Sequence, residues 1–159
     1  LQGNALFLDL DVVIVDNIDS FFTHPGDFLI IHDWKRPWRI TGNSSVYRFK
    51  LGAFPGLMPY FREHFDEIRQ KFRNEQAYLS WYVDQEKKLS YWPDSWCKSY
   101  KYHCLQKIPL AYFKPPVKPE GAKIIVFHGE INPPDAVNGG GGKWYRYVLP
   151  SQWIKDAWQ

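Results

Sequence analysis

Two aspartates separated by a single leucine carry the strongest chemical signal in this chain. Asp9 and Asp11 lie inside the apolar run from Ala5 to Val15. Because alternate residues of a strand project from the same face, the carboxylates of a strand over 5–15 would point together. Carboxylates on a buried strand are costly unless a cation or a proton neutralises them. Hard divalent ions such as Mg²⁺ and Mn²⁺ take carboxylate oxygens together with substrate phosphates, so the pair predicts a metal-and-phosphate site.

Strands and helices are expected to alternate along the chain around this pair. An amphipathic helix is predicted from Leu57 to Phe72, and a second one follows Asn74, whose side chain can cap it. Ser151 can cap a last helix. This interspersed order predicts the α/β class, in one domain over residues 1–159. The remaining expected elements are a buried strand over 5–15 that breaks near the aspartates, short strands over 28–31, 46–49 and 124–127, a loop over 34–43 and a mobile glycine-rich segment over 138–142.

Composition narrows the class of partner. The 159 residues carry a net charge of +3 without a strongly basic segment, which argues against a nucleic-acid partner. Aromatic residues make up 18% of the chain, and most of them are expected to pack in the core. Trp34 and Trp38 are expected either to pack in the core or to anchor their loop. Cys97 and Cys104 have neither metal-knuckle nor disulfide-framework spacing, so two free thiols in a reducing compartment are expected. With no run of about 20 apolar residues and no leader, the sequence predicts no membrane span and a cytoplasmic protein.

Three further segments, each at the start or end of an expected strand or helix, accompany the aspartate pair. Asn43-Ser44-Ser45-Val46 enters a strand, Glu75-Gln76 begins a helix, and Ile125-Val126-Phe127-His128-Gly129 ends a strand. Taken in order with Asp9-Leu10-Asp11, this set resembles nucleotide-sugar glycosyltransferases of the GT-A fold. The likeness is to the glycogenin-like and lipopolysaccharide galactosyltransferase-like enzymes of family 8, and it implies a GT-A-like mixed sheet flanked by helices, incomplete at the N-terminus. The resemblance implies transfer of a sugar from a nucleotide diphosphate donor, most simply a UDP-sugar, to a carbohydrate acceptor in polysaccharide biosynthesis, with retention of anomeric configuration.

The resemblance also implies a ligand set for Mn²⁺ or Mg²⁺. In that family the counterparts of Asp9, Asp11 and His128 hold the metal on the donor diphosphate. Gly129 would let the backbone approach the phosphates closely. The same resemblance assigns Asn43 and Ser44 to donor binding and places Glu75 and Gln76 at the donor sugar. Glu75 also has a structural explanation, because an acidic residue is favourable at a helix N-terminus. Asp33 or Glu75 could serve as the general base of an inverting route.

The chain departs from the family pattern at three places. Asn132 stands where the family has a lysine on the diphosphate, a charge that Lys143, Lys35 or Arg36 could replace. Ser45 stands where the family has a glycine. Only eight residues precede Asp9, so the nucleotide-binding part that GT-A enzymes place before this motif is expected to be missing, and the chain is either a fragment or a reduced relative.

Two other functions fit the same residues. Asp9-Leu10-Asp11 also resembles the motif of haloacid dehalogenase-like phosphatases, with Asp9 as nucleophile and Asp11 as general acid, although Val12 stands where a glycine is usual. In the other alternative the chain is a non-catalytic carbohydrate-binding module whose aromatic residues contact glycans. These three functions predict different behaviour: metal-dependent use of a UDP-sugar, a covalent aspartyl-phosphate, or metal-independent glycan affinity.

Overall fold

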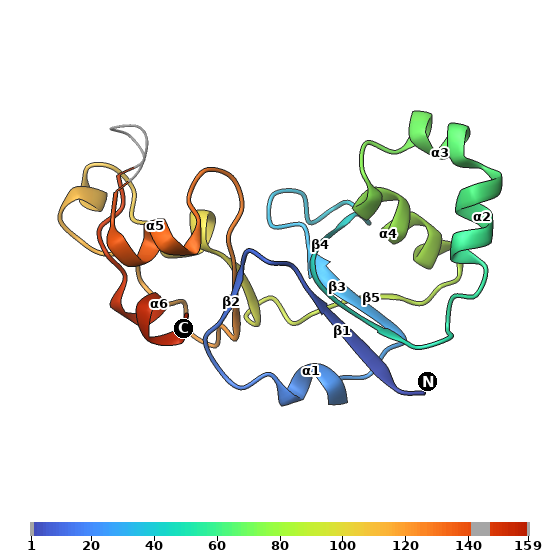
Figure 1. Cartoon of the computed structure of the whole chain (residues 1–159), viewed down its shortest axis with the longest axis horizontal. Helices are drawn as coiled ribbons and strands as arrows, with labels where there is room; N and C mark the ends of the chain where they lie inside the picture. The colour runs from blue at the N-terminus through green and yellow to red at the C-terminus, as the bar shows by residue number, and fades with distance from the viewer. Residues whose placement is uncertain (1, 141–146, 159) are drawn as a thin grey trace. The chain divides into compact units, whose positions relative to one another are not determined.

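The computed structural model describes residues 2–140 and 147–158 and has mixed α/β content, as predicted from the sequence. Its secondary structure is built around two separate mixed sheets (Figure 1). The chain divides into two compact units, and each unit combines two stretches of sequence. The first unit comprises residues up to Leu8 together with Asp19–Trp92, and the second comprises Asp9–Ile18 together with the chain from Pro93 onward. The predicted single domain over 1–159 stays a prediction.

The first unit contains a four-stranded sheet in the order β1-β4-β3-β5. All its neighbouring pairs are antiparallel except β3 with β5, which run parallel. The central strand β3 is apolar and buried over its first four residues, as its run of Phe, Leu and Ile predicts. The strands are β1 (Asn4–Leu8), β3 (Phe28–His32), β4 (Gly42–Lys50) and β5 (Leu89–Tyr91).

The helices of this unit follow the sequence prediction with one correction. The single helix expected from Leu57 to Phe72 is wrong, because the chain breaks at His64, whose backbone leaves the helical region. The His64 ring stacks on Tyr60 at 4.1 Å between centroids. Asn74 caps the next helix as expected, accepting a hydrogen bond from the Ala77 N–H. The helices are α1 (Asp19–Thr23), α2 (Leu57–Glu63), α3 (Phe65–Lys71) and α4 (Glu75–Gln85).

A fully buried arginine ties α1 and the loop after it to the sheet of the first unit. Arg48, on β4, has only 1% of its surface exposed. Its guanidinium donates to the carbonyls of Phe21 (3.0 Å), His24 (2.7 Å) and Gly26. Burial lowers the pKa of Arg48 from its ordinary value, which expresses the cost of desolvating the cation. Charge-assisted hydrogen bonds to carbonyls offset that cost.

The second unit packs a three-stranded sheet, β2-β7-β6, against short helices. β2 pairs antiparallel with β7, and β6 pairs parallel with it. Its core includes Val13, Ile125 and the stacked rings of Tyr100 and Phe127, whose centroids are 4.4 Å apart. Its elements are β2 (Val12–Ile14), β6 (Cys97–Ser99), the π-helix η1 (Tyr100–Cys104), the 3₁₀ helix η2 (Leu110–Tyr112), β7 (Ile124–Val126), α5 (Pro133–Asn138) and α6 (Gln152–Ala157).

Three other expectations have definite outcomes. The strand over 5–15 breaks near the aspartates, as expected, and the two parts, β1 and β2, belong to different sheets. The expected burial is wrong for β1, which is only partly buried. Cys97 and Cys104 are free thiols, as expected, and burial raises the pKa of Cys104 to about 12. None of the helices in the described part of the chain is long and apolar enough to cross a membrane.

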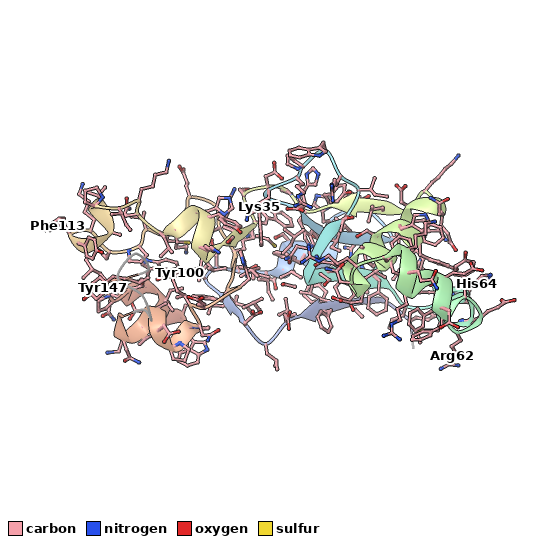
Figure 2. All side chains as sticks on the ribbon, turned by 90° about the horizontal axis from the view of Figure 1, so that it is seen from above. Lys35, Arg62, His64, Tyr100, Phe113 and Tyr147 are labelled. Carbon is pink, nitrogen blue, oxygen red and sulfur yellow. The ribbon has the colours of Figure 1, made fainter. Side chains whose placement is uncertain are left out.

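The role of Arg48 predicts a large loss of stability on its removal. Arg48→Met should lower the free energy of unfolding by about 3 kcal/mol, because buried carbonyls lose their donor. Urea unfolding followed by tryptophan fluorescence measures this change. Arg62, which projects from α2 away from the ribbon (Figure 2), is the matched control, and Arg62→Met should change stability by less than about 0.5 kcal/mol. Equal effects of the two substitutions would contradict the structural role of Arg48.

Candidate functional site

The two aspartates flank a turn rather than sharing a strand. β1 ends at Leu8 and β2 begins at Val12, so Asp9-Leu10-Asp11 forms the connection. Leu10 is fully exposed at its tip, and its N–H donates to Asp9 Oδ1 at 3.0 Å. The apolar run that predicted a buried strand therefore ends in a short polar turn, where the carboxylates can approach each other from neighbouring positions.

Asp11 carries an uncompensated negative charge within this turn. Its Oδ1 is buried and has no hydrogen-bond partner among the described residues. Burial raises the pKa of Asp11, and the charge of Asp9 raises it further, whereas its own backbone hydrogen bond acts in the opposite direction. A carboxylate oxygen in this condition suits either a bound cation or a proton.

The backbone of Asp11 lies directly beside the segment that contains His128. The ladder between β2 and β7 pairs Val12 with Val126, and the Phe127 N–H continues it by donating to the Asp11 carbonyl at 2.8 Å. Two segments more than 110 residues apart in sequence, the aspartate turn and the end of β7, are thereby held together. The ligand set implied by the resemblance requires such proximity, and the shared metal itself stays a prediction.

The side chains of this ladder nevertheless alternate between two faces. Val13, Ile125 and Phe127 share the face that enters the core of the second unit. In the same register Asp11 belongs to that face and His128 to the opposite one.

His128 has partners on its own face of the sheet. Its Nε2 lies 2.6 Å from the Ser99 Oγ, and its ring lies 5.0 Å from that of Tyr102. In the described part of the chain, no group of three or more His, Cys, Asp or Glu side chains gathers as a metal site. The two aspartates fit a cation by their chemistry, and His128 as third ligand stays a prediction.

Gly129 and Asn132 follow His128 in the predicted phosphate-binding segment. Gly129 has a φ of +97°, which favours glycine, and a Cβ built there would meet no atom within 4 Å. Backbone conformation therefore explains this glycine, and the space beside it is open. Asn132 is the N-cap residue of α5, a position that favours asparagine over lysine, and its backbone N–H donates to Asp135 Oδ2 at 2.9 Å. Lys143 and the part of the predicted glycine-rich segment at 141–142 lie outside the described residues.

The donor-sugar candidates of the first unit form a second cluster. Ser44 on β4 donates from its N–H to Gln76 Oε1 (3.3 Å) and from its Oγ to Glu75 Oε1 (3.2 Å). Asn43 Oδ1 accepts a hydrogen bond from the Ser45 N–H at 3.0 Å, which fixes the side chain of Asn43. Two motifs 31 residues apart in sequence are thus in direct contact, and their role at a sugar subsite stays a prediction.

Close packing of α4 on β4 makes this contact possible. The Gly42 N–H donates to Ser80 Oγ at 3.0 Å, and that hydroxyl donates to the Gln76 carbonyl at 2.7 Å. A Cβ at Gly42 would lie 2.6 Å from the Ile30 Cγ2, so only glycine fits here. The Asn74 cap then sets Glu75 and Gln76 in the first turn of α4.

The remaining candidates of the first unit have different environments. Asp33 Oδ1 accepts hydrogen bonds from the N–H groups of Lys35 (2.8 Å) and Arg36 (3.3 Å), which is the arrangement of an Asx turn. This carboxylate therefore has a structural use, and a role as general base stays a prediction. Trp38 is 77% exposed, so core packing is wrong for this residue, and its face is available to solvent.

Sequence reasoning missed the surroundings of His128 in the second unit. Ser99 and Tyr102, which contact the imidazole, come from β6 and η1. Both lie in the stretch between Asp94 and Glu120, which contains five lysines and no acidic residue. This local excess of positive charge, which the net charge of +3 for the whole chain conceals, is the sequence feature that could have drawn attention to this region.

Comparisons with known proteins add no family to this description. A scan against protein-family models gives no match, and a search of curated proteins gives none either.

Asp11 provides a prediction about stability and pH. Its pKa is raised in the folded state, which means that the folded protein disfavours the charged form of Asp11. The free energy of unfolding therefore falls as pH rises through the folded-state pKa. Asp11→Asn should therefore raise the free energy of unfolding at pH 7 in metal-free buffer, and the gain should disappear below about pH 3, where Asp11 is protonated in both states. Urea unfolding at the two pH values measures this, with the exposed Glu120→Gln as control. A loss of stability at pH 7 would contradict the description of Asp11.

Proposed function

We propose that this chain belongs to a metal-dependent glycosyltransferase that moves a sugar from a nucleotide diphosphate donor, most simply a UDP-sugar, to a carbohydrate acceptor. The observation that carries the proposal is the orphaned carboxylate oxygen of Asp11 beside Asp9, in a turn whose backbone is bonded to the segment before His128 and Gly129. The contact between Ser44 and the Glu75–Gln76 pair supports it independently. A cytoplasmic location forms part of the proposal, and the two free thiols are in keeping with it.

The carboxylates of the aspartate turn are the residues that would hold Mn²⁺ or Mg²⁺, with His128 as the proposed third ligand. These carboxylates would hold the ion where its charge would offset that of the diphosphate and favour departure of the nucleotide diphosphate. Asp11 accommodates it because a cation removes the charge penalty on its buried oxygen. Gly129 leaves room for phosphate oxygens close to the backbone. Lys143 would contribute the positive charge that Asn132 lacks.

The sugar-binding role falls to the cluster on β4 and α4. Gln76 accepts from the Ser44 N–H through Oε1, which fixes the orientation of its amide and leaves the NH₂ group to donate. Glu75 uses one oxygen on the Ser44 hydroxyl and keeps acceptor capacity for a sugar hydroxyl. Such a pair can position the donor sugar by one donor and one acceptor. Retention of anomeric configuration follows from the family resemblance and is part of the proposal.

Binding of a metal–nucleotide pair is the first test. Thermal denaturation of the whole chain with Mn²⁺, with UDP and with both should give the largest rise in Tm for the pair, because the folded state alone binds it. Asp9→Asn and Asp11→Asn should each abolish the additional rise, and Glu120→Gln should leave it unchanged. UDP binding that needs no metal and is unchanged by the two substitutions would overturn the proposed metal–nucleotide site.

The raised pKa of Asp11 also favours one alternative, a phosphatase in which Asp11 is the general acid and Asp9 the nucleophile. That enzyme releases phosphate from small phosphoesters through a covalent aspartyl-phosphate on Asp9. Mass spectrometry of the chain after reaction with acetyl phosphate distinguishes the two enzymes. The glycosyltransferase predicts no adduct, whereas an adduct lost in Asp9→Asn would establish the phosphatase. Glycan affinity without metal dependence would instead indicate the carbohydrate-binding module.

The sugar-binding cluster gives a separate prediction about rate. Gln76→Ala and Glu75→Gln should slow Mn²⁺-dependent hydrolysis of the preferred UDP-sugar by about 100-fold, because the sugar is no longer held in line. Mn²⁺-dependent binding of UDP itself should survive both substitutions. Gln70→Ala on α3 is the control for a helical glutamine and should retain the rate. Unchanged hydrolysis in both cluster variants would exclude these residues from the sugar site.

A further inference from the structure

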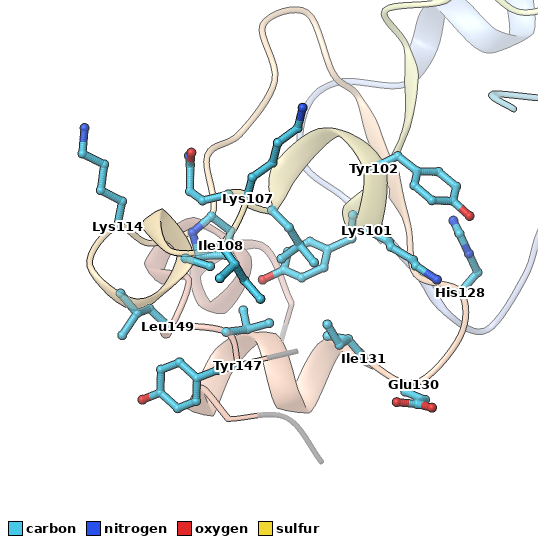
Figure 3. Close-up of a pocket in the computed structure, with 16 residues that line it drawn as sticks. Lys101, Tyr102, Lys107, Ile108, Lys114, His128, Glu130, Ile131, Tyr147 and Leu149 are labelled. Carbon is cyan, nitrogen blue, oxygen red and sulfur yellow. The ribbon is translucent and has the colours of Figure 1, made fainter. Parts of the chain in front are cut away.

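A cavity of about 630 Å³ lies within the second unit (Figure 3). Three segments contribute to it: Tyr100–Pro116, the turn after β7 with His128, Glu130 and Ile131, and Tyr147–Leu149. This volume is within the range of protein sites for small molecules, which are mostly apolar with a few polar groups at defined positions. None of the roles proposed above uses this cavity except through His128.

The walls of the cavity are mainly apolar. Leu105, Ile108, Ile131 and Leu149 contribute aliphatic groups, and Tyr147 contributes an aromatic ring. Ile108 is 47% exposed although it is aliphatic, which leaves apolar surface for a ligand to cover. The walls therefore suit the apolar chain or ring of a ligand.

One end of the cavity is polar and carries hydrogen-bond donors. Lys101 Nζ lies 5.6 Å from the centroid of the Tyr102 ring, and that ring lies 5.0 Å from the imidazole of His128. Figure 3 shows the Lys101 side chain extending towards this end, whereas Lys107 and Lys114 extend away from the cavity. An ammonium group and a tyrosine hydroxyl at one end of an apolar cavity suit an anionic head group.

The charge around the cavity has the same sign as its polar end. Its charged lining residues are three lysines and one glutamate, Glu130. The segment that supplies the lysines has no acidic residue between Asp94 and Glu120. Phe113, also in this segment, is 78% exposed and extends away from the ribbon in Figure 2. A positive potential next to exposed apolar side chains attracts an anion that carries an apolar group.

We propose that this cavity binds an amphiphilic phosphate, with the apolar chain or ring against Ile108, Ile131 and Leu149 and the phosphate at Lys101 and Tyr102. If the proposed glycosyltransferase function holds, on which this role rests, the ligand is the apolar phosphate carrier of the acceptor glycan. The binding itself does not depend on a donor or a metal.

Calorimetric titration of the whole chain with three compounds tests the cavity. Octyl phosphate has both features, octyl glucoside has the chain without the charge, and inorganic phosphate has the charge without the chain. Octyl phosphate should bind at least about tenfold more tightly than either of the others. Equal affinity for octyl glucoside or for inorganic phosphate would overturn the proposal.

Matched variants locate the binding. Lys101→Met should weaken octyl phosphate about tenfold, and Lys155→Met on α6 should leave it unchanged, since both residues are exposed lysines and only Lys101 lines the cavity. Ile108→Asn should weaken octyl phosphate and leave inorganic phosphate unaffected. If Lys101→Met binds as the unchanged chain does, or if both lysine variants weaken binding equally, the cavity is not the site.

Two further measurements distinguish cavity binding from adsorption to a membrane surface and from the proposed glycosyltransferase function. Flotation with phosphatidylglycerol vesicles distinguishes cavity binding from adsorption to an anionic surface: binding to vesicles without any affinity for monomeric octyl phosphate would overturn the cavity. Titration in EDTA separates it from the proposed function. Octyl phosphate binding together with failure of Mn²⁺–UDP binding would refute the glycosyltransferase and keep the cavity, and the reverse pair of results would refute the cavity alone.

Discussion

Burial disfavours the charged form of the Asp11 carboxyl, and the proposed chemistry of the second unit depends on what offsets this cost. One oxygen of this carboxylate is buried without a partner in the described chain, and Asp9 adds repulsion from a neighbouring position. A protein that needed only a stable turn would gain from an amide at this place, since burying a charged group costs more than burying a neutral one. The pair of carboxylates therefore suits a proton or a cation, and the cation belongs to the proposed function.

Backbone pairing, rather than side-chain contact, sets where that ligand would lie. The β2–β7 ladder bonds the Asp11 carbonyl to the Phe127 N–H and brings the turn against the end of β7. The same ladder sends the side chains of Asp11 and His128 to opposite faces, and His128 pairs with Ser99. The imidazole would thus have to leave the Ser99 hydroxyl to join the aspartates at a metal. In the first unit, by contrast, side chains make the contact themselves, since Ser44 bonds directly to Glu75 and Gln76.

Local patterns in the sequence were sufficient for much of the fold. The apolar run of β3, the Asn74 cap of α4 and the strand before His128 are short-range signals, and each element forms as predicted. The break between β1 and β2 was expected near the aspartates, but apolar periodicity does not reveal that the two strands belong to different sheets. The break at His64 was equally hidden, because the apolar spacing continues through it.

The candidate site was predictable as residue types and only partly as geometry. The resemblance singled out Ser44, Glu75 and Gln76 as separate candidates, and their direct contact is a finding of the structure that the sequence did not predict. Which face His128 occupies depends on strand register, which no local pattern specifies. The cavity of the second unit combines segments distant in sequence, so its apolar walls could not be predicted, although the lysine-rich stretch between Asp94 and Glu120 could have drawn attention to it.

Paramagnetic broadening by Mn²⁺ tests the central claim most directly. In a ¹⁵N–¹H NMR spectrum of the whole chain, substoichiometric Mn²⁺ should first broaden the amide signals of Leu10, Asp11 and Phe127. The Leu10 N–H donates to Asp9 Oδ1, and the Phe127 N–H donates to the Asp11 carbonyl. Broadening that begins elsewhere, or spreads evenly over the exposed acidic residues, would contradict a cation site at Asp9 and Asp11.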